Sequence, residues 1–228
     1  MRKSAQNVEA VNLTAEQQTL LASIPDPMFR QTTRDFCVNQ QFRKDYWVKG
    51  CRTLTALEQA EALRGQRILL AQPRADVGLK VTGSLGEATL QEAVYGPILD
   101  QLADHKPKTL GQLEQALKAT PSTQSLSFAQ ILQAAMVLSA TGAVQAVQDD
   151  AVVQKAKKRT DRLNVYLMTK ARSSNELSYL ASPVTGGGVT VPRFQQLFLL
   201  AKQQGHKHPQ DWANFVWNIL ALQNQRLV

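Results

Sequence analysis

Signals that start and stop helices recur along this chain of 228 residues and restrict it to short elements. Thr14 and Thr109 are each followed three residues later by a glutamine, a pattern in which a hydroxyl and an amide satisfy the first main-chain groups of a helix. Asp26 before Pro27 is another start signal, since proline at the first helical position loses no hydrogen bond. Gly65 ends a further helical pattern.

Between these signals the spacing of apolar residues predicts helices and a few strands. Helical spacing covers residues 13–24, 27–39, 55–64, 95–103, 109–117, 127–139, 154–171, 194–201 and 212–220. The pattern changes at residues 67–71 and 79–82, which we predict to be strands of one small sheet, and residues 143–147 predict another strand. In the helix over 154–171, Leu163, Tyr166 and Leu167 are the predicted buried side. The predicted fold class is α+β and mainly helical.

The order of elements suggests three parts. Residues 1–85 form an N-terminal part with helices and a small sheet. Residues 86–150 place three helices before a strand, which predicts a winged-helix-like unit. Residues 151–228 form C-terminal helices packed on it.

The charge favours acidic partners but does not choose among nucleic acid, protein and an anionic surface. The formal net charge is +8 and the isoelectric point is about 9.7. Five cations lie between Lys155 and Arg162, and we expect helical spacing to spread them around a solvated helix start. No run approaches the roughly 18 apolar residues of a membrane span, and Met1–Asn7 lacks a secretory apolar stretch, so we expect a cytoplasmic protein without membrane contact.

No pattern of catalytic or metal-binding residues stands out. Cys37 and Cys51 form no Cys-x-x-Cys pair, so we expect buried reduced thiols. His206 and His208 lack further zinc ligands and are predicted to be surface residues. Gly186–Gly188 is predicted to be a turn or a close backbone contact, with anion binding as the alternative, because no lysine of a phosphate-binding loop follows.

The segment from Arg34 to Gly50, RDFCVNQQFRKDYWVKG, combines aromatic, amide and arginine side chains. Arginine and aromatic residues together are typical of protein-binding surfaces. The candidate interaction residues are Arg34, Asn39, Phe42, Arg43 and Trp47. The structural alternative is a buried amide, with an arginine that caps a helix end or pairs with Asp35 or Asp45.

With Ile24-Pro25-Asp26-Pro27 before it and Leu180–Val189 after it, this segment resembles the methyltransferase regulatory domain, over about residues 13–227. That module follows the S-adenosylmethionine-binding domain in certain bacterial protein (lysine) methyltransferases. The resemblance implies a non-catalytic role in regulation or substrate recognition. It also implies two partners, a substrate protein and a catalytic domain that is either part of the same chain or separate.

The chain itself is not expected to bind S-adenosylmethionine or to be an enzyme. Val81–Gly86 has two glycines after a predicted strand, but the next helix begins late and no acidic strand end follows to hold a ribose. The cofactor would therefore enter only through the partner catalytic domain. An enzyme with a site built from residues that form no known motif stays open as another class.

A stand-alone winged-helix protein that binds DNA is the alternative function. The net charge of +8 and the helices between Tyr95 and Ser139 favour it. Gln130 and Gln133 could read bases, but no Lys or Arg lies between Ala119 and Ala151 to contact phosphates. Nucleic acid is therefore the less favoured partner.

Replacement of Arg43 separates the two interpretations of the aromatic segment. If Arg43 anchors an interface, Arg43→Ala should weaken partner binding by about tenfold while the melting temperature barely changes. A lower melting temperature would instead support the capping role. Thermal denaturation and a binding titration of the same variant make the comparison.

Overall fold

The computed structural model describes residues 12–42, 48–50, 52–83 and 85–224. The chain divides into two compact units, residues 1–146 and residues 147–228. The division into three parts, 1–85, 86–150 and 151–228, stays a prediction.

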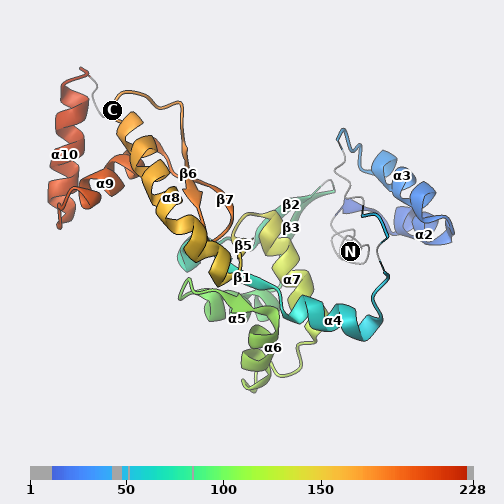
Figure 1. The fold of residues 1–228 in the computed structure, drawn as a ribbon. Coiled ribbons are helices and arrows are strands. Elements are labelled where there is room, and N and C mark those ends of the chain that lie inside the picture. The colour runs from blue at the N-terminus through green and yellow to red at the C-terminus, as the bar shows by residue number, and fades with distance from the viewer. Residues whose placement is uncertain (1–11, 43–47, 51, 84, 225–228) are drawn as a thin grey trace. The chain divides into compact units, whose positions relative to one another are not determined.

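Both units combine helices with short antiparallel strands (Figure 1). The helices of the first unit are α2 (Ala15–Ser23), α3 (Pro27–Cys37), α4 (Ala56–Arg64), α5 (Glu92–Leu102), α6 (Leu110–Lys118) and α7 (Phe128–Ala140), with a 3-10 turn at Arg74–Asp76. Its strands are β1 (Arg67–Leu70), β2 (Lys80–Gly83), β3 (Gly86–Thr89), β4 (Lys108–Thr109) and β5 (Val144–Ala146). The second unit contains α8 (Asp150–Lys170), β6 (Tyr179–Ser182), β7 (Gly187–Thr190), α9 (Arg193–Gln203) and α10 (Pro209–Ala221). The predicted mainly helical α+β class is confirmed.

The predicted helix starts are confirmed by their caps. Thr14 and Thr109 each form a complete capping box, and Asp26 Oδ1 accepts a hydrogen bond from Phe29 N at 2.6 Å. Thr55 and Ser127 form capping boxes that the sequence analysis did not identify. Helix α3 ends at Cys37, before the predicted end at residue 39, because Asn39 has a φ of 50° and cannot continue a right-handed helix.

Strand β1 lies between β4 and β5 and pairs antiparallel with both. The prediction that residues 67–71 and 79–82 share a sheet is wrong, because β2 pairs instead with β3 in a separate hairpin. The hairpin closes locally through Gly86, whose φ of 115° is readily adopted only by glycine. Strand β1 therefore joins partners that lie far from it in the sequence.

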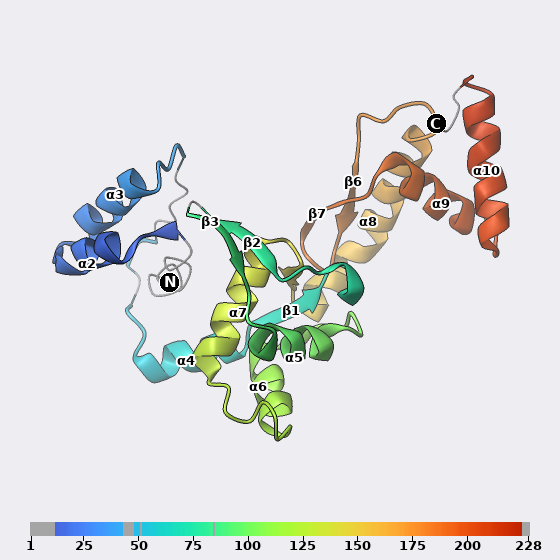
Figure 2. The same ribbon diagram turned by 180° about the vertical axis from the view of Figure 1, so that it is seen from behind.

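Helices α5, α6 and α7 gather around β1 in both views (Figures 1 and 2). Ile68 and Leu70 alternate along β1 with half-buried residues and enter one apolar core. The fully enclosed side chains of this core come mainly from the three helices: Ile98, Leu99, Leu102, Leu113, Ile131 and Ala134. This core fits the predicted three-helix pattern, but its identity as a winged helix stays a prediction.

Helix α8 corrects the sequence analysis in two respects. It begins at Asp150, earlier than predicted, and its buried side is not the predicted one. Leu163 is 47% exposed and Tyr166 is 58% exposed, whereas Met168 is buried and the predicted Leu167 is half-buried. Asn164 sets this orientation, because its side chain donates to Ala181 O and accepts from Ala181 N, both at 2.8 Å.

The hairpin of β6 and β7 was missed by the sequence analysis, which predicted a loop before α9. Its turn contains Gly186, with a φ of 72°. The Gly186 N–H donates to Ser182 O at 2.9 Å, and the Thr185 N–H donates to Ser182 Oγ at 3.2 Å. The prediction of a turn is confirmed for Gly186 and is wrong for Gly187 and Gly188, which belong to β7. These glycines concealed the strand, because they weaken the usual strand pattern.

Glu114 links α6 to α4 through a buried carboxylate. Its Oε2 accepts from Arg64 Nε and its Oε1 accepts from Lys118 Nζ, both at 2.7 Å. The Arg64 guanidinium also lies 4.5 Å from the ring centroid of Phe128. Hydrogen bonds from Arg64 and then Lys118 hold the pKa of Glu114 below its usual value of 4.5. Ionised Glu114 therefore stabilises the folded state.

We expect Glu114→Gln to lower the free energy of unfolding at pH 7 by about 1–2 kcal/mol, a modest value because Arg64 and Lys118 both reach solvent. The folded-state pKa is depressed, so the carboxylate contributes fully above its unfolded value of 4.5 and less as the pH falls through the folded value. The difference between variant and parent should therefore shrink in acid. Urea denaturation across pH measures it.

Glu61→Gln is the matched control, because Glu61 pairs with the same Arg64 at 2.9 Å but is exposed. It should leave stability almost unchanged. Equal losses from both variants at pH 7 would contradict the role of the buried Glu114 carboxylate.

Candidate interaction surface

Helices α2 and α3 pack together around their own apolar cluster. Leu13, Leu21 and Ile24 are buried, and Cys37 and Val38 pack against them. This placement leaves the Cys37 thiol half-buried rather than fully buried as predicted, and Cys51 lies outside the described residues. Cys37 Sγ forms no disulfide.

Arg30 connects the start of α3 to the end of α2. Its Nε and Nη2 donate to Ile24 O at 2.8 and 2.5 Å. Pro25 precedes the Asp26 cap and separates the two helices, so the guanidinium replaces the main-chain donor that a continuous helix would supply. The side of α3 that carries Arg30 therefore faces α2.

The other side of α3 exposes two aromatic rings. Phe29 is 61% exposed and Phe36 is 83% exposed. They lie seven residues apart, which is two helical turns, so both belong to one face, the α3 aromatic face. No residue of α3 is buried. Large aromatic side chains that find no core inside their own fold are typical of surfaces that contact another protein.

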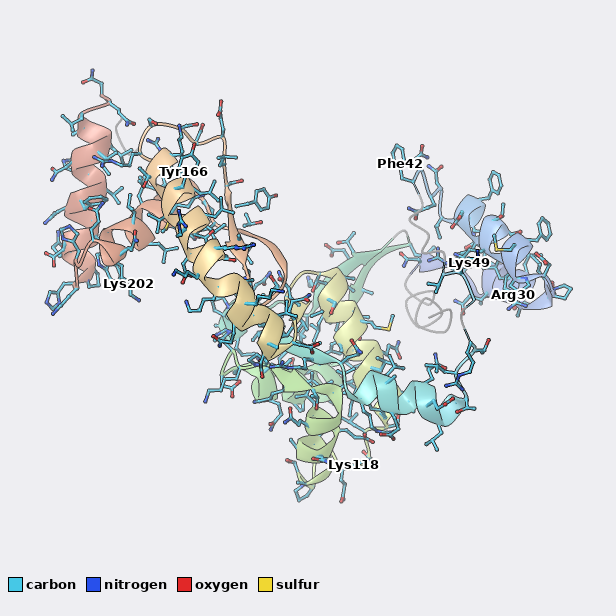
Figure 3. The ribbon with its side chains drawn as sticks, viewed as in Figure 1. Arg30, Phe42, Lys49, Lys118, Tyr166 and Lys202 are labelled. Atoms are coloured by element: carbon cyan, nitrogen blue, oxygen red, sulfur yellow. The ribbon has the colours of Figure 1, made fainter. Side chains whose placement is uncertain are left out.

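Three of the five predicted site residues lie in or directly after α3. Phe42 is 87% exposed and lies beyond the end of α3 (Figure 3). Arg34 is half-buried, with Nη1 3.7 Å from Asp35 Oδ1. Asn39 is exposed, and its Oδ1 accepts from Gln41 Nε2 at 2.8 Å. Arg43 and Trp47 lie outside the described residues.

These positions change the interpretation of the segment. Asn39 and Gln40 are exposed, so the alternative of a buried amide is wrong for both of them. The sequence analysis missed Phe29, although its spacing of seven residues from Phe36 inside a capped helix was a usable signal. The structure thus shifts emphasis from the arginine and amide groups to exposed aromatic rings.

A second apolar surface lies in the other unit. A groove of about 280 Å³ runs between α9 and α10. It is lined by Phe194, Phe198, Ala213, Asn214, Val216, Trp217 and Leu220. Its lining contains no acid, histidine or cysteine, so these side chains can bind apolar groups but offer no general acid or base.

Among the acids that the structure describes, the one with the largest pKa shift is explained by a helix start. Glu58 accepts hydrogen bonds from Arg52 Nη2 at 2.8 Å and from Thr55 N at 2.8 Å. These bonds, led by Arg52, lower the pKa of Glu58 to about 2. Because Glu58 is exposed and completes the capping box of α4, its shift indicates structure rather than catalysis.

Within the described ranges, no group of three or more His, Cys, Asp and Glu side chains is placed to hold a metal ion. His208 is exposed, and the half-buried ring of His206 lies 5.5 Å from that of Phe215. Among the helices whose placement is described, none combines the length and apolar character that a bilayer span requires. The cytoplasmic location stays a prediction.

Comparison with known proteins finds two similarities. The model of the predicted methyltransferase regulatory domain matches residues 3–49. The uncharacterized protein sll1526 of Synechocystis sp. is 37% identical over 221 residues, which cover 97% of this chain and 42% of the relative. No solved structure matches the chain. The α3 aromatic face falls inside the matched residues, and the Leu180–Val189 motif falls outside them. The resemblance to the methyltransferase regulatory domain is thus confirmed for residues 3–49.

Proposed function

We propose that this chain is a non-catalytic module that regulates a bacterial S-adenosylmethionine-dependent protein lysine methyltransferase or recognises its substrate protein. The observation that carries the proposal is a coincidence of two features. The residues that match the regulatory domain also contain α3, whose aromatic face enters no apolar cluster among the described residues. A module that works through contacts with other proteins needs such a surface.

The catalytic domain is the partner that we propose for the α3 aromatic face. The chain spans 42% of the length of sll1526, so that relative has a large remainder outside the match. We propose that this remainder contains the catalytic domain and binds S-adenosylmethionine. Phe29 and Phe36 would then be buried against the catalytic domain. Each aromatic ring typically buries about 150–250 Å² in such contacts.

The absence of cofactor binding by the chain itself is part of the proposal. Residues 81–83 and Gly86 belong to the β2–β3 hairpin, where strand leads to strand. A dinucleotide-type site needs a strand that leads through a glycine turn into a helix, whose N-terminus faces the ligand. The hairpin geometry supports a role in which the partner domain holds the cofactor.

The structure weakens the case for DNA binding, because Gln130, one of the two side chains that could read bases, is already hydrogen-bonded within the protein. Gln130 Oε1 accepts from Ser127 N and from Ser127 Oγ, both at 2.9 Å, so this side chain completes the capping box of α7. Helix α7 also carries no Lys or Arg to contact phosphate. These observations favour the protein partner over DNA.

Two titrations test the proposed function. The chain should give no heat with S-adenosylmethionine in isothermal titration calorimetry, whereas the part of sll1526 outside the match should bind it. The chain should also bind that part, and Phe29→Ser combined with Phe36→Ser should weaken binding by about tenfold, since aromatic anchors often contribute 1–2 kcal/mol or more.

Leu57→Ser is the matched control, because Leu57 is an exposed apolar residue on α4 outside residues 3–49. It should leave the affinity unchanged. One-to-one binding of S-adenosylmethionine to the chain would overturn the non-catalytic role. A loss from Leu57→Ser as large as that from the double variant would overturn the assignment of the α3 aromatic face.

A further inference from the structure

Helix α8 has one side that packs and one side that does not. Asn164, Met168 and Ala171 lie on its packing side, where Asn164 binds β6 and the other two enter apolar clusters. Their spacings of four and three residues place them along one face of the helix. Residues on the opposite side of α8 therefore point away from this unit into solvent.

The outward side carries a row of cations. Lys155, Arg159, Arg162 and Lys170, here called the α8 basic stripe, follow one another at four, three and eight residues, which keeps them on one face. All four are exposed. Tyr166 belongs to the same row (Figure 3). Lys170 Nζ lies 5.6 Å from the centroid of its ring. Lys157 lies on the opposite side of α8, so the cations of residues 155–162 also spread around the helix as expected.

No carboxylate interrupts the stripe. Asp161 lies on another side of α8, where its Oδ2 accepts from Lys157 Nζ at 2.8 Å. Residues 147–228 contain eleven Lys and Arg against five Asp and Glu, so the second unit holds six of the eight excess positive charges. The stripe is therefore a local concentration of positive charge within a unit whose net charge already attracts anions.

We propose that the α8 basic stripe binds an acidic helical segment of a partner protein. Its cations span 15 residues, or about 22 Å of helix, and carboxylates spaced three and four residues apart on a second helix would match them along that length. Arg159 and Arg162 can each hold a carboxylate with two hydrogen bonds. Tyr166, and Leu163 beside it, add the aromatic and apolar contacts that protein interfaces favour.

The width of the stripe favours a protein helix over nucleic acid. The cations form a narrow row with exposed Lys158 at its edge, whereas Lys157 lies on the opposite side of α8 and pairs with Asp161. A duplex would require cations spread over a wider surface that reaches phosphates of both strands. The stripe lies in a different unit from the α3 aromatic face, so this inference does not rest on the proposed function.

Fluorescence anisotropy with a labelled probe tests the inference on the whole chain. The probe is a helical peptide of about 20 residues, built from alanine and leucine, with glutamates at the spacings of the stripe. We expect saturable binding at low salt that weakens as salt rises. Arg159→Glu combined with Arg162→Glu should weaken it by about tenfold or more, because each reversal replaces an attraction with a repulsion.

Lys202→Glu combined with Lys207→Glu is the matched control, because both residues are exposed in the same unit and the change in net charge is identical. It should change the affinity by less than about twofold, since these residues lie outside the row. Circular dichroism verifies that both variants stay folded.

Three results would overturn the inference. The first is no saturable binding of the peptide. The second is an equal loss from both double variants, which would indicate attraction by overall charge. The third is tighter binding of duplex or single-stranded DNA of similar length with the same dependence on Arg159 and Arg162, which would assign the stripe to nucleic acid.

Discussion

The pairing of β1 on both of its edges is the constraint on which residues 56–146 depend. Hydrogen bonds to β4 and β5 satisfy its main-chain groups inside the fold, where unpaired groups would cost free energy. Strand β4 leads directly into the capped start of α6, and β5 follows the end of α7. The two pairings therefore position both helices over Ile68 and Leu70 and enclose a single core.

In the second unit, the Asn164 side chain has a comparable effect on a smaller scale. It binds the N–H and the C=O of Ala181, as a neighbouring strand would, and so fixes which side of α8 meets β6. Leu163 and Tyr166 then turn toward solvent, although their hydrophobic character predicts burial. The same rotation directs the α8 basic stripe outward, so a polar contact determines where the charges act.

The two proposed surfaces use different physical chemistry. The α3 aromatic face would bind through the burial of two rings, which depends little on salt. The α8 basic stripe would bind through charge and should respond strongly to salt. A module with both surfaces could contact a catalytic domain and a second protein with separate parts of its chain, which agrees with the proposed role in regulation or substrate recognition.

The sequence by itself determined the local structure. Thr14, Asp26 and Thr109 mark helix starts correctly, because a cap depends on residues only three positions apart. The mainly helical class and the resemblance carried by residues 34–50 were also readable, whereas the candidate site was only partly so. Phe42 and Arg34 were among its candidates and Phe29 was not. The spacing of Phe29 from Phe36 was readable, but its exposure depends on how α3 packs against α2. The tertiary structure alone decided the partners of β1, the hairpin at residues 179–190 and the outward side of α8. The hairpin is local, but the glycines of β7 hide its strand pattern. The partners of β1 and the outward side of α8 depend on contacts between residues distant in the chain, which no local pattern of spacing or charge encodes.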